Sequence, residues 1–206
     1  MNSDIIKDNI KRVQDNIAEA AILSGRKPED ITLIAVTKTH PPETIAAAVA
    51  AGADDIGENK FQEAESKFQS LERDHPDLQF TRHMIGHLQS NKARKAALMF
   101  DLIHSLDRLK LGRKLSLVAE EEGMVIPALL QVNTSGEKSK FGCAPEEAAS
   151  LAAKLAQLPG IKLRGLMTIG AFLPDPEQVR PCFVMLRELA EKIRSEDIPG
   201  AEMEHL

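Results

Sequence analysis

The 206-residue sequence predicts an α/β fold with parallel strands, and three observations lead to that prediction. Short aliphatic and β-branched runs alternate along the chain with longer stretches of helical spacing. This alternation favours parallel pairing, because each helix returns the chain to the same end of the sheet. No Gly/Ser-rich linker or low-complexity stretch divides residues 1–206, so we expect a single domain; for an α/β barrel this length is at the small end.

The first expected helix begins near Ser3, a capping residue type, and ends at Gly25. Its apolar face has helical spacing and consists of Ile6, Ile10, Val13, Ile17 and Ala21. The remaining elements are expected as strand 31–36, helix 43–51, strand 54–57, helix 61–73, strand 79–85, helix 91–99, strand 101–104, helix 107–122, strand 125–132, helix 145–158, strand 161–168 and helix 176–194. A last apolar stretch begins at Ala201.

Composition argues against several functional classes. The formal net charge of -5 argues against a nucleic-acid surface, which needs a basic excess. No apolar run has the length of a membrane span, and the N-terminus lacks a secretory apolar region, so we expect no membrane partner and a cytoplasmic location. Cys143 and Cys182 form no CxxC pair, which indicates neither a zinc site nor a disulfide framework.

Lys38 is the residue that suggests chemistry. It follows the strand at 31–36, which is aliphatic enough to be buried, and Pro42 then lies in the first turn of the next helix. A lysine at the mouth of an α/β sheet is partly desolvated, which favours the neutral amine. A neutral amine attacks aldehydes, the chemistry of a Schiff base. The alternative is a solvated lysine that ends a strand.

Polar residues also follow the next two strands. Glu58 could pair with a lysine amine and Asn59 can donate and accept hydrogen bonds; alternatively, both begin a helix. His83 and His87 have HxxxH spacing, but the glutamate of HExxH and further ligands are missing. We therefore expect His83 to bond the backbone or a ligand rather than a metal.

Two later segments complete the candidate site. Residues 133–142 form a polar, basic stretch that is not a Walker A loop, because the order of glycine, lysine and serine is wrong. The stretch is either a substrate loop or a solvated loop. Met167 or Thr168, at the end of a strand, could line a pocket, although methionine is more often a core residue.

Together, five strings resemble a known family: VTKTHPPETI, GADDIGENKFQEAESK, HMIGHLQSNKARK, LLQVNTSGEKSKFG and LRGLMTIG. They are similar to the pyridoxal phosphate homeostasis proteins, the YggS/PROSC group, from the first helix to the last residue. The resemblance implies a TIM-type (β/α)8 barrel like the N-terminal barrel of alanine racemase. It matches Lys38 to the lysine that holds pyridoxal 5′-phosphate (PLP) as a Schiff base.

The resemblance also implies a function. The protein would buffer and deliver PLP, affect amino-acid and keto-acid balance, lack strong catalytic activity and act as a monomer. PLP-dependent apoenzymes are candidate recipients. Lys38 would bind the cofactor, Asn59 would orient its ring hydroxyl or the lysine, and His83 and Met167 would be further cofactor-binding residues.

The chain departs from the family pattern in two places. Arg82 stands where the family usually has tryptophan, which suggests a partly exposed position without a function. Family members also continue beyond Leu206 with the segments that carry most phosphate-binding groups, so the barrel is expected to be incomplete at strands 7 and 8. Any bound cofactor would then be poorly held. Two explanations stay open: such a chain lacks these groups, or it is part of a longer protein.

Two enzymatic functions are alternatives to a PLP carrier. A PLP-dependent amino-acid racemase needs a tyrosine from a second domain as its second proton-transfer group, and this chain contains no tyrosine. A class-I aldolase would form its imine on a substrate carbonyl without any cofactor. The motif match favours the PLP carrier.

Overall fold

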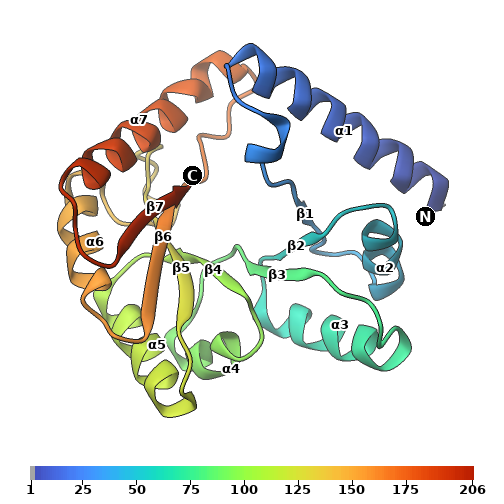
Figure 1. Cartoon of the computed structure of the whole chain (residues 1–206), viewed down its shortest axis with the longest axis horizontal. Coiled ribbons are helices and arrows are strands. Elements are labelled where there is room, and N and C mark those ends of the chain that lie inside the picture. Colours follow the sequence, from blue (N-terminus) through green and yellow to red (C-terminus); the bar gives the residue numbers. More distant parts are fainter. Residues whose placement is uncertain (1–2) are drawn as a thin grey trace. The chain divides into compact units, whose positions relative to one another are not determined.

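The structure, a computed structural model, describes residues 3–206. It consists of two compact units, the first ending at His83 and the second running from Met84 to Leu206 (Figure 1). Both units are built from parallel strands alternating with helices, as the sequence predicts. Within residues 3–206, no helix is both long and apolar enough to cross a membrane.

The first unit contains two strands and the first three residues of a third. Val36 of the first strand pairs in parallel with Gly57 of the second, and the Thr81 amide of the third donates to the Asp54 carbonyl, with an N–O distance of 2.8 Å. The elements are α1 (Ser3–Leu23), η1 (Pro28–Asp30), β1 (Ile34–Val36), α2 (Pro42–Ala50), β2 (Asp55–Glu58), α3 (Phe61–Asp74) and β3 (Thr81–Met84).

The second unit contains four strands, which pair in parallel and in chain order. Figure 1 shows α5, α6 and α7 along one side of these strands. The elements are η2 (Ser90–Lys92), α4 (Ala93–Ala97), β4 (Leu102–Leu106), α5 (Leu109–Glu122), β5 (Ile126–Gln131), η3 (Pro145–Glu147), α6 (Ala148–Ala156), β6 (Ile161–Met167), α7 (Pro176–Ser195) and β7 (Ala201–His205).

Helix boundaries follow residue chemistry. Gly25, just past α1, has φ of +74°, a left-handed conformation that glycine adopts without a steric penalty. Pro42 is the first residue of α2, where its missing N–H has no intrahelical partner to lose. Asp175 caps α7, its carboxylate accepting from the Glu177 amide at 3.0 Å.

The prediction that residues 31–36 form a buried strand is wrong in both respects. β1 comprises only Ile34–Val36, and none of its residues is buried; Val36 is 47 % exposed. Apolar composition reports what a strand is able to bury, whereas its actual burial depends on what other parts of the chain pack against it.

β7 is more complete than the resemblance implied. It runs over Ala201–His205 in parallel with β6, and Gly165 of β6 pairs with His205. A Cβ added at Gly165 would lie 2.0 Å from the His205 carbonyl oxygen, so this close approach requires glycine. Arg164 also forms an ion pair with Glu204 across the two strands. The expectation that most of strand 7 is missing is therefore wrong.

Candidate functional site

Lys38 lies in a turn two residues beyond the end of β1, as the sequence predicts. Its side chain is exposed, however, whereas the sequence predicted a partly desolvated one. What the structure adds is a set of contacts on the two residues that flank it, Thr37 and Thr39.

Thr37 is buried and fixed through three of its groups. Its amide donates to the Gly57 carbonyl with an N–O distance of 3.0 Å. Its hydroxyl donates to Glu58 Oε1 at 2.7 Å, and its carbonyl accepts from Lys67 Nζ at 2.8 Å. The chain before Lys38 is therefore held by both β2 and α3.

Lys67 of α3 is the centre of these contacts. Besides the Thr37 carbonyl, its Nζ lies 2.8 Å from Glu58 Oε1 and 2.6 Å from Glu63 Oε1. The Lys67 side chain is 8 % exposed and that of Glu58 0 %. An ammonium has three N–H donors, and here three acceptors surround it.

Thr39 is held from the other side of Lys38. Its amide donates to Glu63 Oε1, with an N–O distance of 2.5 Å. Its φ of +65° is left-handed, which is unfavourable for a β-branched residue. The hydrogen bond from Lys67, and then the Thr39 amide, hold the pKa of the Glu63 carboxyl below its ordinary value. We call Thr37, Thr39, Glu58, Glu63 and Lys67 the Lys67 cluster.

The expectation that Glu58 pairs with a lysine amine is confirmed, with Lys67 as the partner. The alternative, a helix start, is wrong for Glu58, which lies in β2. The sequence analysis missed Lys67 itself, although two signals were available. Lys67 follows Glu63 by four residues, and it falls on the same helix face as the buried residues Ala64 and Phe68.

Asn59 follows β2 directly and is half-buried. Lys38 and Asn59 each come two positions after a residue of the Val36–Gly57 pair, so both follow the carboxyl ends of neighbouring parallel strands. The Asn59 Oδ1 atom is buried and has no hydrogen-bond partner within residues 3–206. A buried carboxamide oxygen of this kind can accept a hydrogen bond from a ligand hydroxyl.

His83 is buried in β3, and its Nε2 lies 2.8 Å from Asp55 Oδ1 of β2. His87 instead stacks on Phe141, with 3.9 Å between ring centroids, and its Nδ1 lies 3.7 Å from Asp107 Oδ2. The part of the chain that is described contains no group of three or more metal-binding side chains. The two histidines of the HxxxH spacing thus have different carboxylate neighbours, Asp55 for His83 and Asp107 for His87.

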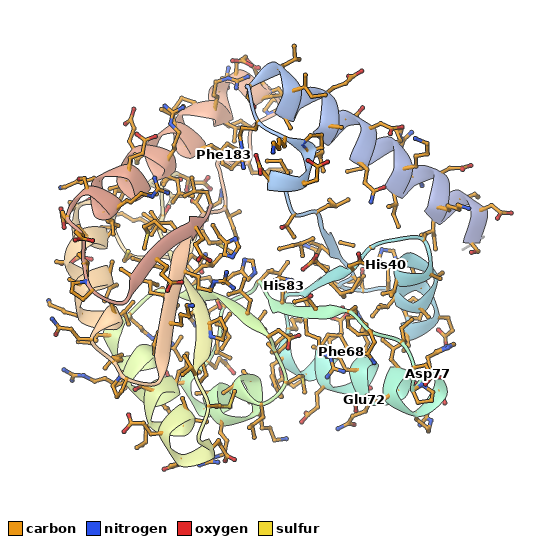
Figure 2. The ribbon with its side chains drawn as sticks, in the orientation of Figure 1. His40, Phe68, Glu72, Asp77, His83 and Phe183 are labelled. Atoms are coloured by element: carbon orange, nitrogen blue, oxygen red, sulfur yellow. The ribbon has the colours of Figure 1, made fainter. Side chains whose placement is uncertain are left out.

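Arg82 is partly exposed, as its charge suggested. Its guanidinium lies 5.1 Å from the ring centroid of Phe68 and 5.5 Å from that of Phe80, and it pairs with Glu72 at 3.0 Å. Phe68 and Glu72 are labelled on α3 in Figure 2. Arg82 thus packs strand β3 against α3, a structural role.

In the second unit, Met167 is the last residue of β6 and is half-buried, so it is not a fully enclosed core residue. Its neighbour Thr168 donates its hydroxyl to the Val132 carbonyl at 2.8 Å and lies 2.8 Å from the Thr134 hydroxyl. These bonds join the chain after β6 to the chain after β5.

Residues 133–142, here called the Asn133 loop, contain many internal hydrogen bonds. The Asn133 side-chain amide donates to the Glu137 carbonyl at 2.9 Å, and the Ser135 hydroxyl donates to Asn133 Oδ1 at 3.0 Å. Lys140 Nζ lies 2.9 Å from Glu137 Oε1 and donates to the Gly170 carbonyl at 2.5 Å. The Lys140 hydrogen bond lowers the pKa of Glu137.

Comparison with known sequences shows similarity along the whole described chain. Residues 2–206 match the family model of the alanine racemase N-terminal domain. The pyridoxal phosphate homeostasis protein of Pseudomonas aeruginosa is 45 % identical over 191 residues, which cover 89 % of this chain and 78 % of the relative.

Solved structures give the same picture. The structure of PipY from Synechococcus elongatus with PLP bound has a TM-score of 0.75 and 36 % identity, covering 91 % of this chain and 85 % of PipY. An alanine racemase of Clostridium difficile has a TM-score of 0.73 at 14 % identity, over 93 % of this chain and 51 % of the racemase, and shows the fold alone. The fold is an α/β fold of the TIM-barrel type.

Proposed function

This chain belongs to the pyridoxal phosphate homeostasis protein family, and from that premise we propose that it binds PLP at Lys38 and acts as a carrier or buffer of the cofactor. The observation that carries the proposal is the fixed turn around Lys38: the residues on both sides are anchored while the lysine side chain is exposed. The PLP present in the PipY structure supports the choice of cofactor.

PLP supplies an aldehyde, whose oxygen leaves as water when the Lys38 amine forms a C=N bond to the aldehyde carbon. The chain's own contribution is to present that amine at a fixed point. Asn59 Oδ1, which has no hydrogen-bond partner among residues 3–206, is suited to accept a hydrogen bond from the ring hydroxyl, and this supports Asn59 as a second cofactor-binding residue. His83, paired with Asp55, and Met167 remain proposed cofactor-binding residues.

The exposure of Lys38 supports a carrier rather than an enzyme. A carrier must release its cargo, and an amine from a recipient protein has to reach the bond at Lys38 in order to replace it. The absence of tyrosine further weighs against a two-base racemase, since the second proton-transfer group of that mechanism is missing from this chain. We therefore infer that any amino-acid racemisation is weak, and that PLP-dependent apoenzymes are the recipients.

The same proposal includes a single domain over residues 1–206, a monomer in solution and a cytoplasmic location. Size-exclusion chromatography with light scattering tests the monomer at the concentration used for cofactor binding. A dimer mass would contradict it.

The test is a near-ultraviolet and visible titration with PLP, followed by borohydride reduction and peptide mass mapping. The chain contains no tryptophan or tyrosine, so its own absorbance leaves the cofactor bands clear. We expect a band that disappears on reduction and an adduct on Lys38. Lys38→Ala should abolish the band, whereas Lys11→Ala, which removes an exposed lysine of α1, should retain it.

Adducts scattered over exposed lysines, with equal bands in Lys38→Ala and the unchanged protein, would refute the proposal. Dialysis after loading measures retention, which we expect to be weak because Lys38 is exposed. A racemisation assay with L-alanine and the loaded protein tests the enzymatic alternative. Turnover that Lys38→Ala removes would favour a racemase-like enzyme over a carrier.

A further inference from the structure

Lys67 lies at the centre of a buried group of charges that acts on the backbone around Lys38. One cation, Lys67, lies within 2.8 Å of two carboxylates, Glu58 and Glu63. Through the Thr37 carbonyl and the Thr39 amide, the same charges reach the residues immediately before and after Lys38.

We propose that Lys67 is a positioning residue for Lys38. By clamping the main chain on both sides of Lys38, it sets the direction in which the Lys38 side chain leaves the main chain. The inference rests on the proposed function, since it concerns the amine that would take PLP. The clamp has two arms. Lys67 Nζ holds the Thr37 carbonyl directly, and it holds Glu63, whose carboxylate in turn accepts from Thr39.

The geometry gives the two lysines different tasks. Lys67 Nζ has three acceptors within 2.8 Å, and the side chain is 8 % exposed, so an aldehyde has no access to this nitrogen. Lys38 has the exposure that Lys67 lacks. The nucleophile and the charge that orders its turn are therefore separate residues.

The backbone conformation of Thr39 is a second observation that supports the clamp. A β-branched residue at φ of +65° is strained, and such a conformation persists only where its surroundings impose it. The bond from the Thr39 amide to Glu63 is the contact that imposes it. Without the clamp, the turn is expected to relax and the Lys38 amine to sample many directions.

The experiment compares two clamp variants with two matched controls. Lys67→Met removes the central charge at similar length, and Glu63→Ala removes the acceptor of the Thr39 amide from a side chain that is 26 % exposed. The controls are Lys11→Met, which removes a lysine from the exposed pair with Asp15, and Gln62→Ala, the exposed neighbour of Glu63 on α3.

The first readout needs no cofactor: amide hydrogen exchange at Thr39, measured by nuclear magnetic resonance. Loss of a hydrogen bond to a charged group should speed this exchange by about tenfold or more in Glu63→Ala and Lys67→Met. Both controls should match the unchanged protein. Should Lys67→Met unfold, Glu63→Ala carries the comparison, because its carboxylate is partly exposed.

The second readout is the rate at which PLP attaches to Lys38, from the visible band and peptide mapping, corrected for the folded fraction. We expect about a tenfold slower rate in both clamp variants. A purely structural role would leave the corrected rate unchanged. Equal Thr39 exchange and equal attachment rates in Glu63→Ala and Gln62→Ala would overturn the proposal.

The two proposals fail in different ways. If the unchanged protein forms no adduct at Lys38, the proposed function fails. The clamp is then decided by Thr39 exchange together with reductive methylation of Lys38 by formaldehyde, which reports on the amine without PLP. Unaltered exchange and methylation in the clamp variants would overturn the clamp alone.

Discussion

The Lys67 cluster and the Asn133 loop use the same chemical pair in different surroundings. In each, a lysine bonds a glutamate of its own segment and a main-chain carbonyl from elsewhere in the fold. Lys67 is 8 % exposed and also contacts the fully buried Glu58, whereas Lys140 is 18 % exposed and its partner Glu137 42 % exposed. A buried ion pair is costly to break, whereas an exposed one is screened by water and salt. The first arrangement therefore fixes a turn, and the second leaves a loop adjustable.

The largest expected difference between the two regions is the loss of stability when the lysine of each is replaced. Lys67→Met should destabilise the protein by about 3–5 kcal/mol, because it leaves buried carboxylate charge without its partner. Lys140→Met should shift the urea midpoint much less, since solvent reaches its partner Glu137. Urea unfolding followed by circular dichroism measures both. Equal losses would show that burial does not distinguish the two regions.

Cys143 reports on the Asn133 loop. Its carbonyl accepts from the Asn133 amide at 2.9 Å, and burial, followed by the charge of Glu147, raises the pKa of its thiol from 9.0 to about 12. With the loop closed, the thiolate fraction at pH 8 should be about a thousandfold below that of an ordinary cysteine.

Iodoacetamide labelling with mass mapping measures the reactivity of Cys143. Cys182, a second buried thiol on another peptide, serves as the internal control. Asn133→Ala removes the side chain that organises the loop and should speed the labelling of Cys143 but not of Cys182. Rapid labelling of Cys143 in the unchanged protein would instead mean that the loop is open most of the time.

Acid should release the Thr39 arm of the clamp. The folded-state pKa of Glu63 is lowered, so its contribution is present above the ordinary value of 4.5 and is lost as pH falls through the folded value. Thr39 exchange, corrected for its intrinsic pH dependence, should rise by about tenfold over that range. Glu63→Gln, which does not titrate, should show no such step. A step that survives in Glu63→Gln would assign it to another group.

The smallest effect concerns strain at Thr39. Asparagine tolerates the left-handed region better than a β-branched residue does, so Thr39→Asn should stabilise the protein by about 1 kcal/mol or less. Thermal unfolding of Thr39→Asn measures this effect, and Thr37→Asn serves as the comparison. Thr37 is buried, so its replacement should lower the stability of the protein. A loss in Thr39→Asn would mean that the threonine side chain contributes packing that outweighs its strain.

Local chemistry made parts of this molecule predictable from sequence. The order of strands and helices follows from periodicity, and the position of Lys38 between β1 and the proline-led start of α2 follows from residue types within a few positions. Gly25 likewise follows the end of α1, as predicted from the ease with which glycine adopts a positive φ.

Long-range packing accounts for what was missed. The exposure of β1 depends on elements distant in sequence, which a run of aliphatic residues does not specify. Lys67 gains its role from the Thr37 carbonyl, 30 residues earlier, and from Glu58 on a neighbouring strand. The local signs of such a partner were the charge of Lys67 on the apolar face of α3 and its spacing of four residues from Glu63.

The clamped turn also has a consequence for conformational entropy. Ordering a flexible segment costs about 1–2 kcal/mol per residue of backbone, and a free lysine side chain carries about 2 kcal/mol of rotamer entropy. Because Thr37 and Thr39 are already fixed in the protein, a molecule that attaches to Lys38 restricts only the side chain between them. Loading and unloading can then proceed without folding or unfolding the turn, and the balance between them is set by the chemistry of one bond.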